Sequence, residues 1–227
     1  MINERDYIWG QNQKLENIDR SKLPEIISQG GYQIILIAGP NGVGKGMVIQ
    51  GLLTRNEGVA QVSRITTRSI TSDENQYHQV SIESFFESID NGSFVEWGKY
   101  GQGYYGTTMG NIADALSSAK KLIIDIDLDG GLVLRNLFEN IGVCVYDCFI
   151  SPIRQNLLES EDGVEKALGE LRRRLLDRDR GEVAKELEGR LRNAGQMLLR
   201  AKEFRHIIVN ERDSISATVL MLEDIVL

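Results

Sequence analysis

A glycine-rich loop between an apolar run and a helical stretch constrains this chain more than any other feature. Residues 33–38 form a β-branched run that is apolar after Gln33, Gly39-Pro-Asn-Gly-Val-Gly44-Lys45 follows directly, and residues 45–53 then have helical spacing. The loop fits the pattern G-x-x-x-x-G-K. Glycines let consecutive backbone N–H groups turn inward around phosphates, the helix N-terminus adds a positive dipole, and the lysine adds a charge. The pattern predicts a nucleotide phosphate site; the alternative is a glycine-rich turn beside an exposed lysine.

Short apolar runs alternate with longer amphipathic stretches along the rest of the chain. Besides residues 33–38, the runs at 122–126, 143–150 and 207–209 are predicted to be strands, and the stretches at 111–120 and 183–202 are predicted to be helices. This alternation is typical of an α/β fold with a parallel sheet.

Three stretches depart from the alternation. Residues 60–110 are rich in Ser, Thr, Tyr and Gly, with one clear helix at 82–90, and predict a small, partly β insertion. Residues 151–205 are dense in arginine and glutamate. Residues 1–30 are polar with scattered apolar positions, which predicts an extension with a short helix near residues 22–28.

The composition limits the classes of partner. The 227 residues include 26 Lys plus Arg against 33 Asp plus Glu, a net charge of −7, which argues against a general binder of nucleic acid or anionic membranes. No apolar run approaches the roughly 18 residues of a membrane span, and no signal peptide is visible. Cys144 and Cys148, with only His78 and His206 beside them, predict buried reduced thiols rather than a zinc site. We therefore expect a cytoplasmic protein.

The phosphate loop lacks one usual ligand. The pattern normally continues with Ser or Thr, whose hydroxyl binds Mg²⁺, but Gly46 and Met47 follow Lys45 here. A thioether cannot replace that hard oxygen ligand. Any Mg²⁺ must then be held by substrate phosphates, waters and carboxylates from elsewhere in the chain.

Taken in order, the motifs resemble those of the guanylate kinase family, P-loop enzymes that transfer a phosphoryl group from ATP to GMP. The matching blocks are GPNGVGK (39–45), TTR (66–68), FVEWGKYGQGYYGT (94–107), LIIDIDLDG (122–130) and HIIVN (206–210). FxEW followed by YYGT at this spacing is highly specific to that family. The resemblance implies an α/β fold, with a P-loop three-layer parallel-sheet core, a small mixed-β subdomain that binds GMP, and a helical lid.

The resemblance also implies a domain organisation. The guanylate-kinase-like domain would span residues 31–227, after an N-terminal extension at 1–30. Within it we expect a core at 31–60, 110–150 and 206–227, a monophosphate-binding subdomain at 61–109, and a lid at 151–205.

By resemblance, Glu96 recognises the acceptor base. Guanine presents two adjacent N–H donors on its Watson–Crick edge and adenine does not, so one carboxylate can accept both and reject adenine. Thr107 matches a hydroxyl that contacts the base, and Asp125 lies on the guanine side of the sheet's carboxyl edge, where ligands bind in open α/β sheets. The alternative for Glu96 is an exposed glutamate at a strand end.

The GMP phosphate is assigned to an arginine and two tyrosines. Arg68 of TTR and the hydroxyls of Tyr77 and Tyr105 fall where the family holds this phosphate, and the planar guanidinium fork suits that task. Tyr104 and Tyr105 could instead be packing aromatics.

ATP is expected on the phosphate loop. Its binding residues would be Gly39, Pro40, Asn41, Gly42, Val43, Gly44, Lys45 and Gly46, with Lys45 also catalytic. Asp127 is expected to hold Mg²⁺, directly or through a water.

Arginines of the lid are expected to stabilise the charge that spreads over the transferred phosphoryl group. Arg174-Leu-Leu-Asp-Arg178 resembles the family's R-L-x-x-R, and Arg190-Leu191 resembles its later R-L. The resemblance therefore implies that Arg178 and Arg190 contact the transition state. The other arginines are expected on a solvated helical face: Arg172, Arg173, Arg180 and Arg192.

Several positions depart from the family pattern. A serine that contacts guanine is replaced by Arg64, and Ser63 could substitute only if the strand shifted its register. A second phosphate-binding arginine is replaced by Thr71, in a shortened loop, and Asp129 replaces a glutamine. These changes touch the acceptor pocket.

The leading prediction is phosphoryl transfer from ATP to GMP or dGMP with Mg²⁺, giving GDP and ADP, by a monomer or homodimer. One alternative keeps this chemistry with another acceptor, such as a modified nucleotide or a sugar phosphate. The other is a catalytically silent binding module of the same fold, although such modules typically lose the phosphate loop that is intact here.

Overall fold

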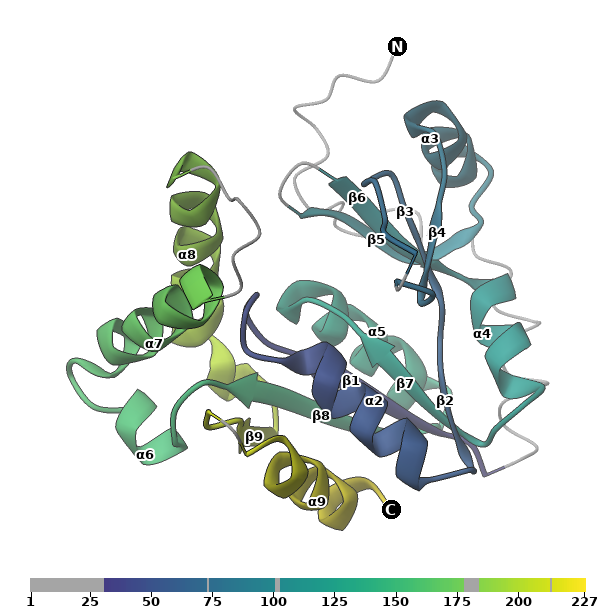
Figure 1. Ribbon diagram of the computed structural model, residues 1–227. Coiled ribbons are helices and arrows are strands. Elements are labelled where there is room, and N and C mark those ends of the chain that lie inside the picture. Colours follow the sequence, from purple (N-terminus) through teal and green to yellow (C-terminus); the bar gives the residue numbers. More distant parts are fainter. Residues whose placement is uncertain (1–30, 73, 101–102, 178–183, 213) are drawn as a thin grey trace. The chain divides into compact units, whose positions relative to one another are not determined.

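The computed structural model describes residues 31–72, 74–100, 103–177, 184–212 and 214–227, with elements labelled in Figure 1. The predicted extension and its helix near residues 22–28 lie outside this part. The larger sheet has strands β1 (Gln33–Ala38), β2 (Val59–Gln61), β7 (Lys121–Asp125), β8 (Cys144–Ser151) and β9 (His206–Val209). It is a parallel five-stranded sheet in the order β2-β7-β1-β8-β9. A second sheet is four-stranded and mixed. The predicted α/β class is therefore confirmed, and the predicted strands of the larger sheet all form.

The chain divides into two compact units. The first contains the described residues up to Ile34 together with Gly58–Ile124 and Val133–Val145; the second contains Ile35–Glu57, Asp125–Leu132 and Tyr146–Leu227.

The first unit carries the mixed sheet. Its strands are β3 (Arg64–Thr66), β4 (Tyr77–Gln79), β5 (Phe94–Tyr100) and β6 (Gly103–Thr108), in the order β4-β3-β6-β5. Strands β3 and β4 are parallel, whereas β6 runs antiparallel to both β3 and β5. Helix α3 (Ile82–Asp90) contributes Phe85 and Ile89 to a core that also holds Phe94 and Tyr104. The partly β insertion is thus a small sheet with its own apolar core.

Helix α4 (Met109–Leu116) begins two residues before the predicted start because a capping box fixes its N-terminus. Thr108 accepts a hydrogen bond from the backbone of Asn111, whose side chain bonds back to Thr108. Such reciprocal caps satisfy backbone donors that the helix itself leaves free.

The second unit contains most of the helices. They are α2 (Lys45–Arg55), α6 (Gln155–Leu158), α7 (Gly163–Asp177), α8 (Ala184–Leu199), the 3₁₀ turn η3 (Ala201–Glu203) and α9 (Ile215–Val226); α5 (Leu128–Asn140) begins in this unit and ends in the first. Helix α2 packs on α9, where Arg55 pairs with Glu223 at 2.8 Å, and α7 packs on α8. The predicted helix at 183–202 is confirmed as α8 followed by η3.

The two cysteines differ in environment. Cys148 is buried in β8, and burial raises the pKa of its thiol to about 12. Cys144, the first residue of β8, is exposed, so the expectation that it is buried was wrong. Both are free thiols, as predicted. Within the described ranges no helix is long and apolar enough to span a membrane.

Candidate active site

The phosphate loop lies in the second unit, between β1 and α2. Gly39 has φ 147°, and a Cβ there would approach the Ile150 carbonyl oxygen to 2.5 Å. Gly44 has φ 94°, and a Cβ there would lie 2.6 Å from Nδ2 of Asn210. Only glycine accepts this combination of positive φ and close neighbours without strain. The motif glycines are thus required by the geometry of the loop.

Side chains from α7 and from the end of β9 hold the loop in shape. Nδ2 of Asn210 donates to the Val43 carbonyl at 2.7 Å, and Thr218 donates to Oδ1 of Asn210 at 2.9 Å. Arg174 donates to the Asn210 carbonyl at 2.9 Å and to Oε1 of Glu170 at 2.7 Å. These buried and half-buried bonds fix the loop's backbone, which is the part of the motif that would meet a phosphate.

Lys45 and two aspartates lie at the carboxyl edge of the sheet in the same unit. Nζ of Lys45 donates to the Gly39 carbonyl at 2.8 Å and lies 3.9 Å from Oδ1 of Asp125. Asp127 accepts from the backbone N–H of Gly130 at 2.9 Å, at the start of α5. Carboxylate oxygens are suitable ligands for Mg²⁺, although the described residues contain no cluster of three or more metal-binding side chains.

The positions after Lys45 are open. Gly46 is exposed, and a Cβ there would have nothing within 4 Å. Met47 is also exposed, with 58% of its surface accessible. The structure therefore has room for the hydroxyl that the phosphate-loop pattern usually supplies. It is missing only because glycine stands at position 46.

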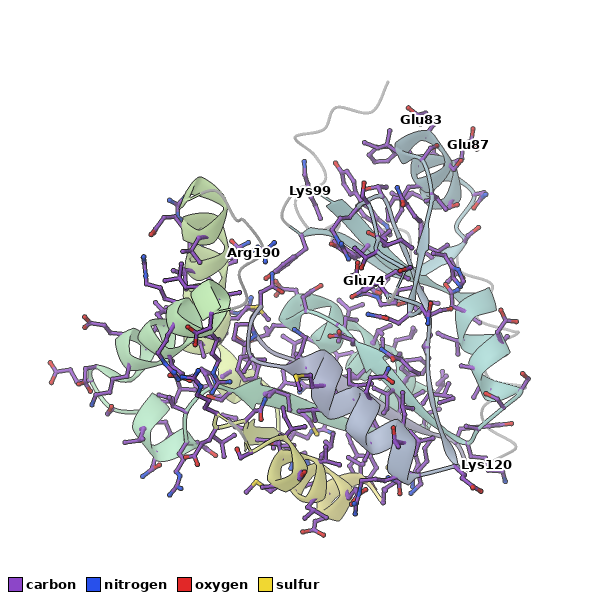
Figure 2. The ribbon with its side chains drawn as sticks, viewed as in Figure 1. Glu74, Glu83, Glu87, Lys99, Lys120 and Arg190 are labelled. Carbon is purple, nitrogen blue, oxygen red and sulfur yellow. The ribbon has the colours of Figure 1, made fainter. Side chains whose placement is uncertain are left out.

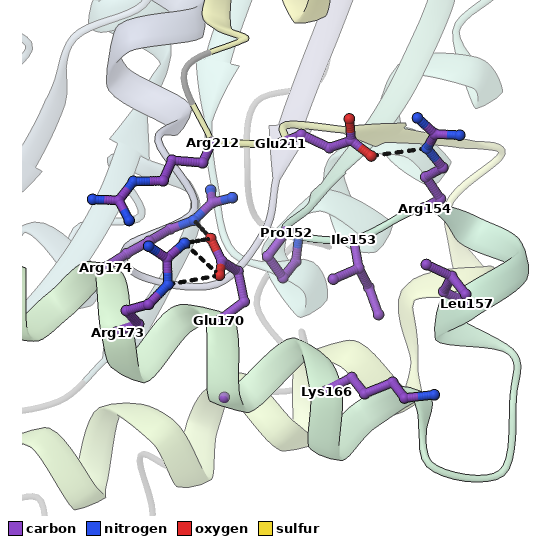
Figure 3. Close-up of a pocket in the computed structure, with 11 residues that line it drawn as sticks. Pro152, Ile153, Arg154, Leu157, Lys166, Glu170, Arg173, Arg174, Glu211 and Arg212 are labelled. Carbon is purple, nitrogen blue, oxygen red and sulfur yellow. Dashed lines mark hydrogen bonds and ion pairs between the residues drawn. The ribbon is translucent and has the colours of Figure 1, made fainter.

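Figure 3 shows a cavity of about 570 Å³ formed by the loop after β8, by α7 and by Glu211 and Arg212. Its basic side chains are partnered: Glu170 binds Arg173 and Arg174, and Glu211 binds Arg154 at 2.8 Å. Arg174 joins this cavity to the phosphate loop, since its side chain contacts the residues that support the loop.

Two of the residues expected to contact the base, Glu96 and Thr107, lie in the first unit, on the mixed sheet. Glu96 on β5 and Thr107 on β6 are paired in register, and Oγ1 of Thr107 donates to Oε1 of Glu96 at 2.7 Å. The β5–β6 register shifts between Phe94 and Glu96, and such bulges re-aim side chains. Glu96 is only 4% exposed, which excludes the alternative of an exposed strand-end glutamate.

Arg64 completes this cluster, which we call the Glu96 triad (Arg64, Glu96 and Thr107). Its Nη2 donates to Oε1 of Glu96 at 2.7 Å, and its Nε donates to Oγ1 of Thr107 at 3.2 Å. Arg64 is 5% exposed, so the ion pair is buried. Removing one partner of such a pair generally costs about 3–5 kcal/mol because the other charge is left uncompensated.

The residues assigned to the acceptor phosphate also cluster in the first unit. Nε of Arg68 contacts the Tyr105 hydroxyl at 3.0 Å, and its guanidinium carbon lies 5.7 Å from the centre of the Tyr77 ring. Glu74, labelled in Figure 2, binds both terminal nitrogens of Arg68, at 2.6 and 3.1 Å. The carboxylate of Glu74 therefore occupies the guanidinium face that a phosphate would use.

Glu74 is held there by a further residue of the shortened loop. The backbone N–H and hydroxyl of Thr71 donate to Oε2 of Glu74 at 3.0 and 3.2 Å. Partial burial by itself would raise the pKa of Glu74, but the hydrogen bonds from Arg68 and Thr71 outweigh it and lower the pKa. The hydrogen bonds from Glu74 raise the pKa of Arg68 in turn.

The remaining residues that the sequence analysis singled out are the arginines of the expected lid, Tyr104 and Ser63. Arg190, labelled in Figure 2, projects from α8 and is half-buried. Arg192 on the same helix is exposed. Arg178 and Arg180 lie outside the described residues. Tyr104 is 2% exposed within the core of the first unit, so it is a packing aromatic, and Ser63 accepts a hydrogen bond from Asn111 at 3.2 Å.

Sequence reasoning did not predict three of these contacts. It gave no role to Glu74, treated Arg64 as a departure from the family, and did not connect Asn210 with the phosphate loop. The last had a usable signal, because Asn210 ends the block HIIVN directly after a strand.

A strand, a phosphate loop with its lysine, a helix, and carboxylates at the sheet edge together define a P-loop nucleotide-binding protein. The family model for guanylate kinase matches residues 31–226, so the chain belongs to the guanylate kinase family, as the sequence motifs indicated. Enzymes of this family are ATP-dependent nucleotide kinases that convert GMP to GDP.

Individual relatives agree with this assignment. A guanylate kinase of Bdellovibrio bacteriovorus is 30% identical over 182 residues, covering 79% of this chain and 89% of that protein. One of Trichodesmium erythraeum is 30% identical over 197 residues, covering 85% and 95%. The crystal structure of guanylate kinase from Anaplasma phagocytophilum has a TM-score of 0.59 at 20% identity, covering 88% of this chain and 86% of that one, which supports the fold.

Proposed function

We propose that this chain transfers the terminal phosphoryl group of ATP to GMP, using the phosphate loop for ATP and the mixed sheet for GMP. The observation that carries the proposal is Oε2 of Glu96, a buried carboxylate oxygen that has no hydrogen-bond partner in the part of the chain that the structure describes and can therefore accept a donor of the base. Family membership supplies the reaction, and the intact loop argues against a catalytically silent module.

In the second unit, Gly39 to Gly46 surround the donor phosphates, and Lys45 neutralises charge on the transferred group. Lys45 lies 3.9 Å from Asp125 and donates to a loop carbonyl, so its ammonium is positioned at the loop rather than in solvent. Asp127 and Asp125 offer the hard oxygen ligands that suit Mg²⁺. Mg²⁺, when bound, would neutralise phosphate charge and align the two substrates.

In the first unit, Arg68 with Tyr77 and Tyr105 binds the acceptor phosphate, while Glu96 and Thr107 bind the base. Arg190, and by the family pattern Arg178, stabilises the charge of the transition state. A cytoplasmic location and a monomeric or homodimeric state remain predictions.

The direct test is an ADP-release assay with ATP, Mg²⁺ and each nucleoside monophosphate in turn. Release with a guanine or related purine acceptor supports the proposal. If the protein binds ATP but releases no ADP with any nucleoside monophosphate, the kinase assignment is wrong, and the binding-module alternative replaces it. ADP release with a sugar phosphate instead would favour the other alternative.

Restoring the missing hydroxyl should lower the Mg²⁺ requirement. Gly46→Ser places an oxygen directly after Lys45, and the open space around Gly46 admits the side chain. The concentration of Mg²⁺ for half-maximal rate should fall severalfold, because the ion gains a protein ligand in place of a water. Gly46→Ala is the matched control, since it adds the same Cβ and also raises helix propensity, but without the oxygen. An equal change in both variants would mean that the hydroxyl position does not face the metal.

Neutralising Glu74 should improve acceptor binding. Glu74→Gln removes the carboxylate that competes with phosphate for Arg68, so the KM for GMP should fall about two- to fivefold, the strength typical of a partly exposed ion pair. Glu87→Gln, at an exposed position on α3 (Figure 2), is the control and should leave KM unchanged. A higher KM for the Glu74 variant would instead show that Glu74 orients Arg68 for the substrate.

A further inference from the structure

The two oxygens of the Glu96 carboxylate have different surroundings. Oε1 accepts from Nη2 of Arg64 at 2.7 Å and from Oγ1 of Thr107 at 2.7 Å. Oε2 is buried and has no hydrogen-bond partner among the described residues. A buried carboxylate oxygen without a donor is costly, and such an atom calls for a ligand or another missing donor.

This asymmetry limits what the carboxylate can accept from a base. A carboxylate has about four acceptor positions, two on each oxygen, and both positions of Oε1 are already used. Guanine needs both oxygens, one for N1–H and one for the 2-amino group. Only Oε2 is without a partner within the described ranges, and one oxygen cannot be aligned with both of guanine's parallel donors. The carboxylate therefore makes one well-formed bond to the base, which N1–H alone can supply.

Arg64 is held in its place beside Glu96 by its burial and by its strand. Its side chain is 6% exposed, and β3 positions it by pairing with β4 at Tyr77 and by the bond from its backbone N–H to the Gln76 carbonyl at 2.8 Å. Moving the guanidinium away would leave buried charge on both partners without compensation.

We propose that Arg64 is a specificity-determining residue that reduces base reading by Glu96 to a single donor, N1–H, so that the acceptor site takes 6-oxopurine nucleotides as a class. GMP and IMP both carry N1–H beside a 6-oxo group and are accepted with similar efficiency. AMP presents an unprotonated N1 to Oε2 and is rejected. This inference rests on the proposed function, and it deepens that function by defining the acceptor class.

The wild-type protein alone provides the first test. Binding of GMP, IMP and AMP is measured by calorimetry, and kcat/KM for each is measured by ADP release. We expect GMP and IMP to agree within about fivefold in both measurements, with AMP at least tenfold weaker. A preference for GMP over IMP of about tenfold or more, the usual worth of a hydrogen bond to a charged group, would overturn the inference.

The readouts separate this inference from the proposed function. Similar binding of GMP and IMP without any ADP release would refute the kinase assignment and leave the base-reading inference intact. Rapid turnover of GMP with poor binding and poor turnover of IMP would support the kinase assignment and refute the base-reading inference.

Variants at position 64 provide the second test. Arg64→Ser frees one acceptor position of Oε1 while Thr107 keeps the other, so the preference for GMP over IMP should rise about tenfold or more. Arg64→Lys keeps a cation on Oε1 and should retain the wild-type ratio. If Arg64 had only a structural role, Arg64→Ser would lower kcat/KM equally for GMP and IMP. An unchanged ratio of the two kcat/KM values would therefore also overturn the inference. Circular dichroism checks that the Arg64→Ser variant folds. If it does not fold, the comparison of GMP, IMP and AMP on the wild-type protein and on the Arg64→Lys variant still tests the inference.

Discussion

Replacing Lys45 by alanine is expected to lower kcat by about 10²- to 10³-fold, the loss seen when one preorganised donor is removed from a developing negative charge. The ammonium lies at the phosphate loop, where Nζ is 2.8 Å from the Gly39 carbonyl oxygen and 3.9 Å from Oδ1 of Asp125. The KM for GMP should change much less, because most of the residues assigned to the acceptor belong to the other unit. Single-turnover measurements of ADP release give the change in kcat directly.

The fold should survive this substitution. Lys45 makes one side-chain hydrogen bond to the backbone, so its removal should shift Tm by only a few degrees. Lys202→Ala, at an exposed position in η3, serves as the control and should leave both kcat and Tm unchanged. Turnover by the Lys45 variant at the wild-type rate would contradict the assignment of the loop as the ATP site.

Removal of Arg190 should have a comparable or larger effect, about 10³-fold in kcat, which is the size expected for an arginine that stabilises a phosphoryl-transfer transition state. Arg190 is half-buried on α8, one residue before the buried Leu191, so the helix holds the base of its side chain in a fixed position. The substrate KM values should change little, because the interaction is made mainly in the transition state.

Arg192→Ala is the matched control for Arg190→Ala. Both residues are arginines on the same helix, but Arg192 is exposed, and its loss should change kcat by no more than about twofold. Equal and small effects at both positions would mean that the family's R-L motif has been aligned wrongly on this chain, and that the transition-state arginine lies elsewhere in the lid.

Elements governed by local pattern could be predicted from the sequence. Strand β1 and helix α3 have the predicted bounds, because the first is an uninterrupted apolar run and the second follows a Ser81 cap with clear helical spacing. Helix α5 was not predicted, because Gly130-Gly131 after a strand is typical of a turn. A Cβ at Gly131 would lie 2.6 Å from the Phe204 ring, so close packing requires the glycine inside a helix. Sequence spacing alone does not reveal such a tertiary requirement.

The site shows the same division between local and long-range information. The phosphate loop is a contiguous motif, and its glycines could be assigned residue by residue. The partners of Glu96 and Arg68 could not, because Arg64 reaches Glu96 from another strand and Glu74 comes from a loop whose length differs from the family's. A substitution that looks like a loss in the sequence, serine to arginine at position 64, is a gained ion pair in the structure.

Because Cys144 is exposed and Cys148 is buried, thiol labelling of the natural chain can measure local opening of the structure around β8. A maleimide fluorophore at neutral pH should attach quickly to the exposed thiol of Cys144, whereas Cys148 combines burial with a pKa of about 12 and has almost no thiolate to react. Labelling of Cys148 must then wait for a local opening of the structure that exposes its side chain in β8. The rate of the second alkylation therefore measures how often the structure around β8 opens, with and without nucleotide, and it requires no engineered cysteine.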